Sequence, residues 1–140
     1  MDKQTEVKLI EKALEYRKRS YSPYSNFKVG AALLAKDGTV FGGCNIENAG
    51  YTPTNCAERT AFFKAVSEGV KTFDAIAIVG GAGEDPDSLC APCGVCRQVM
   101  QEFCNPETFK VIMAVSTDNY EVHTLKELLP YGFGPDNLGK

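Results

Sequence analysis

The sequence predicts an α/β fold, a three-layer α/β/α sandwich around a mixed, mainly five-stranded sheet. Short β-rich apolar runs alternate with stretches of helical periodicity along the 140 residues. That order is typical of a sheet covered by helices on both faces. An Asp-Gly pair between the first two apolar runs predicts an antiparallel hairpin at the start of the sheet. No repeat, linker or low-complexity tract interrupts the chain, so residues 1–140 are expected to form one domain.

The first third of the chain predicts a helix followed by this hairpin. A helix is expected over residues 5–19, because one side of that stretch repeats at helical spacing through Val7, Ile10, Ala13, Leu14 and Arg17. Residues 27–35 form an apolar strand, and residues 39–45 are expected to return antiparallel after Asp37-Gly38. Gly42 and Gly43 in the returning strand predict a close backbone approach or a bulge.

The remaining elements alternate between helix and strand. Thr54 or Asn55 is expected to cap a helix that ends near Glu68, with Gly69 at its C-terminal boundary. The other expected elements are strand 73–79, helix 93–103, strand 109–115, a turn at 117–119 and a short helix 125–129 capped by Thr124.

Composition and charge limit the partners and the compartment. The chain is 44% hydrophobic and 24% charged with a net charge of −3, so it lacks the basic footprint of a protein that binds a nucleic acid polymer. No run approaches the roughly twenty apolar residues of a membrane span, so no membrane partner is expected. The N-terminal stretch is charged and has no apolar signal core, which favours a cytoplasmic location.

Cysteines provide the strongest chemical signal. Six cysteines could form three disulfides, but in a reducing compartment clustered cysteines more often bind metal or do redox chemistry. Cys93 and Cys96 follow Pro92, which suits the first turn of a helix, so their thiolates can lie on one helix face. Cys56 would add a third thiolate. Three thiolates leave a tetrahedral zinc with one open position, which is the pattern of a catalytic site.

Two charged residues follow Cys56 directly. Glu58 cannot easily reach the same ion from the same turn, and it is placed to pass protons to and from a water at the open position. Arg59 would occupy the first turn of a helix, where a cation is unfavourable. We therefore expect Arg59 to lie beside the thiolates and offset their negative charge, with a surface position as the alternative.

Other interpretations of these residues stay open. The Cys93-x-x-Cys96 spacing alone also fits a thioredoxin-like redox motif, and Cys90 is a conceivable metal ligand in the preceding loop. Cys44 and Cys104 lie on apolar stretches and are expected to be small core residues. His123, the only histidine, is expected to be a surface or capping residue.

Four segments of the chain share the pattern of one family: Tyr24-Ser25-Asn26-Phe27-Lys28-Val29-Gly30-Ala31-Ala32-Leu33, Gly43-Cys44-Asn45-Ile46-Glu47-Asn48, Asn55-Cys56-Ala57-Glu58-Arg59-Thr60-Ala61 and Pro92-Cys93-Gly94-Val95-Cys96-Arg97-Gln98. They resemble the short, homotetrameric cytidine deaminases, a zinc-dependent family. The segments occur in the family's order and at its spacing. With Leu128-Leu129-Pro130 they extend over nearly the whole chain.

The resemblance implies a metal, a reaction and a proton carrier. Cys56, Cys93 and Cys96 would hold one Zn²⁺ per chain, and a water activated there would attack C4 of the pyrimidine. Glu58 would take a proton from the water, protonate N3 and later protonate the departing amine. Cytidine and deoxycytidine would give uridine and deoxyuridine with release of ammonia.

The resemblance also implies substrate contacts. Phe27 would pack against the pyrimidine, Asn45 and Glu47 would bind the ribose 3′-hydroxyl, and backbone groups of Ala57 and Cys93 would contact the base. Without the resemblance, Phe27 suits a strand core and the other two side chains suit a turn.

A homotetramer with shared active sites is the implied assembly. In it, Phe133 of one chain would stack near the pyrimidine bound by another chain, and Tyr51 would lie at the subunit contacts beside a neighbouring site. The alternative for Phe133 is packing against its own domain.

Three rival functions remain. A deaminase of cytosine-containing aminonucleoside antibiotics would share both cysteine motifs, although the Asn45–Asn48 segment suits a bare ribose. A polynucleotide-editing deaminase fits poorly with an acidic chain. A structural zinc module would need a fourth protein ligand, where this sequence offers three and a carboxylate.

Overall fold

A mixed sheet of five strands forms the centre of the computed structural model, which describes residues 1–140. The strands are β1 (Lys28–Ala35), β2 (Val40–Cys44), β3 (Phe73–Gly81), β4 (Lys110–Ser116) and β5 (Asn119–Thr124). Their spatial order is β2-β1-β3-β4-β5. Only β3 and β4 are parallel, and the three other neighbouring pairs are antiparallel. The predicted mixed sheet and its opening hairpin are confirmed.

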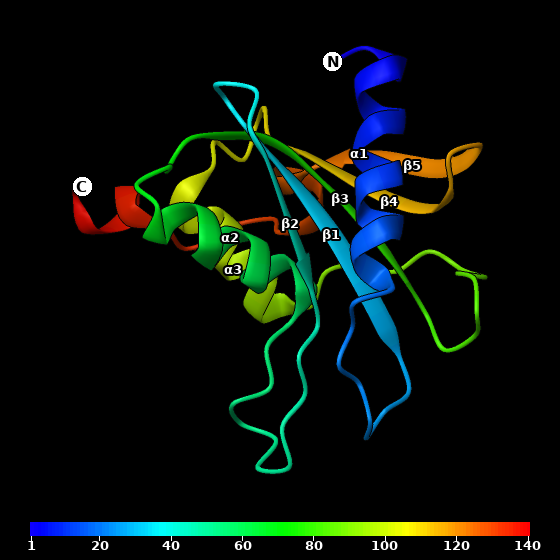
Figure 1. Cartoon of the computed structure of the whole chain (residues 1–140). Helices are drawn as coiled ribbons and strands as arrows, with labels where there is room; N and C mark the ends of the chain where they lie inside the picture. The colour runs from blue at the N-terminus through cyan, green and yellow to red at the C-terminus, as the bar shows by residue number, and fades with distance from the viewer.

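Helices cover both faces of the sheet (Figure 1). Helix α1 (Lys3–Arg17) lies on one face, while α2 (Ala57–Ser67) and α3 (Gly94–Phe103) lie on the other. The core accordingly divides into two clusters, and successive residues of β1 point into different ones. Ala32 packs with Leu9 and Ile10 of α1, whereas Leu33 packs with Phe62 of α2. This alternation builds the predicted three layers.

Two short elements complete the chain, α4 (Leu125–Leu128) and the 3₁₀ helix η1 (Pro135–Leu138). As predicted, Thr124 caps α4: its hydroxyl accepts a hydrogen bond from the Glu127 amide, and the Glu127 carboxylate accepts one from the Thr124 amide. Gly69 follows α2 with a φ of +90°, which fits the predicted end of that helix. None of the helices is both long enough and apolar enough to cross a bilayer.

Helix starts differ from the predicted ones. Helix α2 begins after Cys56, not after Thr54 or Asn55. The reason is that Asn55 exchanges two backbone hydrogen bonds with Ile46, both 2.9 Å long, which keeps Asn55 extended. Helix α1 starts at Lys3 and is capped by Asp2, whose carboxylate accepts a hydrogen bond from the Thr5 amide at 2.8 Å.

The strand that the sequence pattern did not delimit is β5. It lies at the edge of the sheet, where half of its residues are exposed, so its polar composition resembles that of a loop. His123 lies within β5. Its Nε2 lies 2.9 Å from a carboxylate oxygen of Glu121, far from any cysteine motif in the sequence, as expected for a surface residue.

Arg17 connects α1 to the loop that leads into the second cysteine motif. Its side chain is 4% exposed. The guanidinium donates hydrogen bonds to the carbonyl oxygens of Lys28, Gly81, Gly83 and Glu84 at 2.6–3.2 Å. Because all of these acceptors are backbone atoms, Arg17 fixes the path of the chain as it leaves β3.

Gly43 sets the contact between β2 and α2. A Cβ at this position would lie 2.4 Å from the carbonyl oxygen of Ala57 and 2.7 Å from the amide nitrogen of Ala61. The predicted close approach is therefore confirmed, and it occurs at the first turn of α2, next to Cys56. Only glycine lets the strand backbone reach the helix backbone at this distance.

We predict that Gly43→Ala lowers the free energy of unfolding by about 1–3 kcal/mol, the usual cost of overpacking. Backbone atoms block the new methyl group, and they cannot move aside as a flexible side chain would. Urea unfolding of both variants would measure this, with Gly83→Ala as the control because its nearest neighbour would lie 3.5 Å away. Equal stability of the two variants would contradict the prediction.

Candidate metal centre

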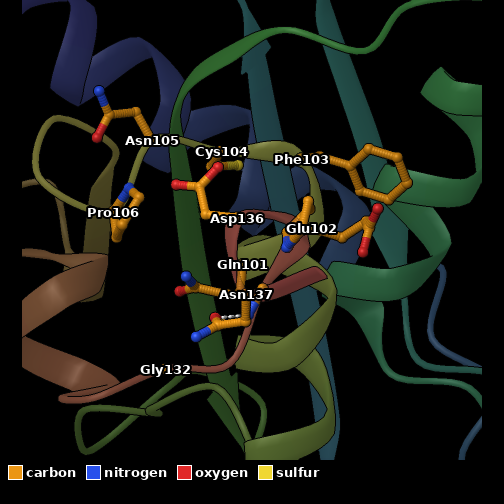
Figure 2. Close-up of a pocket in the computed structure, with 11 residues that line it drawn as sticks. Gln101, Glu102, Phe103, Cys104, Asn105, Pro106, Gly132, Asp136 and Asn137 are labelled. Carbon is orange, nitrogen blue, oxygen red and sulfur yellow. Dashed lines mark hydrogen bonds between the residues drawn. The ribbon is translucent and has the colours of Figure 1, made fainter. Parts of the chain in front are cut away.

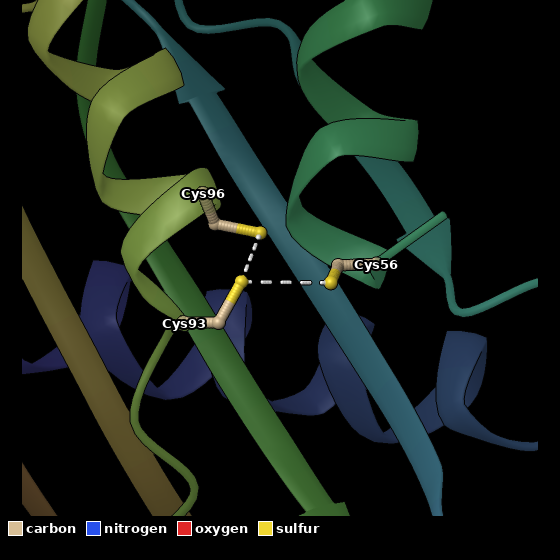
Figure 3. Close-up of side chains that lie close together, drawn as sticks. All are labelled: Cys56, Cys93 and Cys96. Carbon is tan, nitrogen blue, oxygen red and sulfur yellow. Dashed lines mark hydrogen bonds between the residues drawn. The ribbon is translucent and has the colours of Figure 1, made fainter. Parts of the chain in front are cut away.

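Three cysteine sulfurs converge where α2 and α3 begin (Figure 3). The sulfur atoms of Cys56, Cys93 and Cys96 all lie within 4.8 Å of one another, in an arrangement that could hold a metal ion. Cys56 and Cys93 are the N-cap residues of the two helices, and neither uses its side chain as a cap. Both sulfurs are therefore free to face the third.

The spacing of the sulfurs fits zinc. The Cys56–Cys93 and Cys93–Cys96 sulfur separations are 3.8 and 3.6 Å. Tetrahedral zinc with Zn–S bonds of about 2.3 Å places its sulfurs about 3.8 Å apart. The donor set thus has the right element, number and spacing for a zinc ion with one position left open.

The surroundings favour a thiolate at Cys56. The hydrogen bond from Cys96 and the hydrogen bond and charge of Arg59 together lower the pKa of Cys56 to about 5, against the opposing effect of burial. The pKa of Cys96 is raised in turn, first by that hydrogen bond and then by burial. The Nη2 atom of Arg59 lies 3.2 Å from the Cys56 sulfur. The unpaired amides at two helix N-termini add positive potential at the same place.

Arg59 is partly buried, and its guanidinium lies beside the Cys56 sulfur. Its Nε atom is buried without a hydrogen-bond partner. The guanidinium therefore acts on the cluster through one hydrogen bond and its charge.

Glu58 is enclosed beside the three sulfurs without joining them. The residue is 4% exposed and belongs to the first turn of α2. Burial raises the pKa of Glu58 to about 7, and the negative charge on Cys56 adds to the increase. A carboxyl group with a pKa near neutrality can both accept and return a proton.

Cys90 lies in the loop before α3 and not among the three clustered sulfurs. Its sulfur packs against Gly80, where a Cβ would lie 2.8 Å away, and burial raises the pKa of Cys90 to about 11. Cys104 is buried as predicted, whereas Cys44 is only partly buried and its thiol donates to the Arg19 carbonyl.

The predicted ribose contacts, Asn45 and Glu47, both bind the segment that leads into β1. The Asn45 amide donates to the Phe27 carbonyl at 2.8 Å and accepts from the Val29 amide at 2.9 Å. The Glu47 carboxylate accepts from the amides of Tyr24 and Ser25 at 2.9 and 3.1 Å. These side chains therefore hold the loop that presents Phe27.

The sequence pattern did not single out the serine partners of these two residues. The Ser20 hydroxyl donates to Asn45, and the Ser25 hydroxyl donates to Glu47. Each pair is separated by more than twenty residues. No motif or local periodicity marks a contact of that range.

The remaining predicted site residues differ in exposure. Ala57 is fully buried at the start of α2, and Cys93 is exposed. Phe27, Phe133 and Tyr51 are 41%, 57% and 74% exposed. Tyr51 lines an open hollow of about 370 Å³ with Tyr24, Ser25, Glu47, Asn48 and Thr54.

A mixed α/β/α sandwich with three thiolates and a buried carboxylate at two helix N-termini defines a catalytic type of zinc protein. Sequence comparison gives the family. The model of the cytidine and deoxycytidylate deaminase zinc-binding region matches residues 3–113. The chain belongs to the cytidine and deoxycytidylate deaminase family.

Several relatives match over nearly their whole length. The cytidine deaminase of Sporosarcina psychrophila is 50% identical over 131 residues, which cover 94% of this chain and 93% of the relative. That of Halalkalibacterium halodurans is 49% identical over 138 residues, with 99% and 98% covered. The crystal structure of a cytidine deaminase from Burkholderia pseudomallei superposes with a TM-score of 0.81 at 48% identity, over 90% of this chain and 97% of that one.

Proposed function

We propose that this protein hydrolyses cytidine and deoxycytidine to uridine and deoxyuridine, with release of ammonia. The observation that carries the proposal is the buried carboxylate of Glu58 beside the three sulfurs of Cys56, Cys93 and Cys96. Those sulfurs would hold one zinc ion. Zinc supplies a Lewis acid that makes water a nucleophile near neutral pH.

Glu58 carries the protons in this mechanism. It takes one proton from the attacking water and delivers it to N3 of the ring. It then takes the second proton from the hydroxyl group that the water has placed on C4 and delivers it to the amine as the C4–N bond breaks. One carboxylate can serve as base and acid because N3 and the amine are neighbours on the ring, so a single side chain can reach both. Arg59 keeps its charge against Cys56 throughout and offsets the negative charge of the thiolates.

The hollow that Tyr51 lines together with Glu47 favours a nucleoside over a nucleotide. The family model includes deaminases of both kinds of substrate. Glu47 is the only charged residue that lines this hollow. A carboxylate accepts a hydrogen bond from a ribose hydroxyl, whereas a phosphate near it would be repelled. Asn45 would assist Glu47 at the ribose, Phe27 would pack on the pyrimidine, and the Ala57 and Cys93 backbones would contact the base.

We predict that Glu58→Gln keeps zinc and fold but loses turnover by more than the roughly 10²–10⁴-fold typical of one general acid–base group. The excess is expected because one residue serves several proton transfers. Absorbance of the pyrimidine would follow cytidine turnover, with metal analysis and circular dichroism alongside. Glu68→Gln, at the exposed C-terminal end of the same helix, is the matched control. Turnover within tenfold of wild type in Glu58→Gln would rule out the proposed proton carrier.

We also propose that the active form is a homotetramer with shared sites, in the cytoplasm, where the three thiolates stay reduced. Supporting this, the chain exposes large apolar side chains around its C-terminal segment and site loop: Phe133, Leu138 and Tyr51 are 57%, 68% and 74% exposed. Groups of this kind normally mark a contact surface. Phe133 would reach the pyrimidine bound by a neighbouring chain, and Tyr51 would lie at the subunit contact.

Mixed tetramers test the sharing of sites. We expect that Glu58→Gln chains mixed with Phe133→Ala chains regain activity above either parent, because some sites then combine an intact Glu58 with a neighbour's intact Phe133. Native mass spectrometry would verify that subunits have exchanged. Glu58→Gln chains mixed with chains carrying both substitutions should show no gain. An exchanged mixture whose activity only averages its parents would place Phe133 outside the neighbouring site.

A further inference from the structure

The segment that carries Phe133 has little regular structure of its own. It runs from the end of α4 at Leu128 to the start of η1 at Pro135, and we call these intervening residues, 129–134, the tail. Tyr131 within it has a φ of +56°, a left-handed conformation that is uncommon for a residue with a side chain. The ring of Phe133 is mostly exposed. Something other than a helix, a strand or core packing must therefore set its direction.

Two glutamines of α3 contact the backbone of Phe133 and the glycines on either side of it. The Nε2 atom of Gln98 donates a hydrogen bond to the carbonyl oxygen of Phe133 at 2.7 Å. Gln101 packs against the residues on both sides of Phe133. A Cβ at Gly132 would lie 2.8 Å from its Oε1, and a Cβ at Gly134 would lie 3.0 Å from its Cγ. The Gln101 side chain thus fills the space beside both glycines.

Hydrogen bonds also fix both ends of the tail. Before it, Arg97 donates to the Leu128 carbonyl at 2.6 Å and to the Pro92 carbonyl at 2.8 Å. At its last residue, the Gly134 amide donates to the side-chain oxygen of Asn137 at 2.8 Å. Figure 2 shows Gln101 and Asn137 on the wall of the hollow between α3 and the C-terminal segment.

Helix α3 therefore carries two of the clustered cysteines and also holds the tail. Cys93 caps its N-terminus and Cys96 lies in its first turn, while residues 97, 98 and 101 hold the tail. The direction of Phe133 is consequently fixed relative to the helix that carries two of the three clustered sulfurs.

The chemistry of the Gln101 side chain is not what folding alone requires. The Oε1 atom of Gln101 is buried without a hydrogen-bond partner. A buried acceptor without a partner costs folding free energy, and an apolar side chain of similar size would fill the space without that cost.

We propose that Gln98 and Gln101 are positioning residues for Phe133, an inference that rests on the proposed role of Phe133 in a neighbouring site. They hold the Phe133 ring so that it points away from its own chain, in a fixed direction relative to α3. Gln98 does so by its hydrogen bond, and Gln101 by its fit against the two glycines. Neither residue touches the substrate, and both act through Phe133.

A double-mutant cycle tests this. We expect Gln98→Leu to lower kcat/KM for cytidine by about tenfold, because a small misplacement of a positioning group is costly. The loss should appear mainly in KM, since Phe133 contributes binding and not proton transfer. In Phe133→Ala tetramers the same substitution should change kcat/KM by less than about twofold, because a residue that acts only through Phe133 has no further effect once that ring is removed. Zinc content should not change in any variant.

Gln4→Leu, at an exposed position of α1, is the matched control and should leave activity at the wild-type level. A full tenfold loss from Gln98→Leu in the Phe133→Ala background would overturn the proposal, as would Gln98→Leu with unchanged kcat/KM. Gly134→Ala provides a second variant that disturbs the tail through Gln101, should Gln98→Leu fail to fold.

A readout without turnover separates this inference from the proposed function. With 4-fluorophenylalanine at position 133, the ¹⁹F resonance should shift or broaden in Gln98→Leu and stay unchanged in Gln4→Leu. Absent cytidine turnover in the wild type would refute the proposed function alone. An unchanged resonance in Gln98→Leu would refute the positioning role alone.

Discussion

The structure depends on bringing three thiolates and a carboxylate together without mutual repulsion. Three thiolates around Zn²⁺ carry a net charge of −1, and Glu58 is buried next to them. The N-termini of α2 and α3 and the guanidinium of Arg59 offset this charge from different directions. Both helices must therefore begin at the same point in space. Gly43 allows this for α2 through its backbone contact, and the Arg97 bond to the Pro92 carbonyl fixes the approach to α3.

Several residues of the site serve the fold and the substrate region together. Asn45 and Glu47 hold residues 24–29 through hydrogen bonds to the backbone, three accepted and one donated by Asn45, so the loop that carries Phe27 is built before any ligand arrives. Arg17 does the same for the loop after β3, by way of four backbone carbonyls. A loop that is already held in this way would lose little entropy in binding the proposed substrate.

Local sequence patterns predicted the structural features that depend on residues close together in the chain. The hairpin at Asp37-Gly38, the cap at Thr124 and the close approach at Gly43 follow from turn, cap and glycine chemistry, and all are confirmed. The spacing Cys93-x-x-Cys96 with Cys56 predicted a cluster that the structure brings together. The start of α2 was predicted wrongly because Asn55 pairs with Ile46 across a loop. The strand β5 was not predicted, because an edge strand lacks an apolar pattern. The contacts of Gln98 and Arg17 join distant segments, which no local pattern encodes.

The central claim is that Cys56, Cys93 and Cys96 hold zinc with one position open for chemistry. Zinc-edge X-ray absorption of the purified protein and of Cys90→Ser tests this most directly. We expect three sulfur ligands at about 2.3 Å and one nitrogen or oxygen ligand in both proteins. Four sulfur ligands in the wild type, or the loss of one in Cys90→Ser, would make the site a closed structural one and contradict the account.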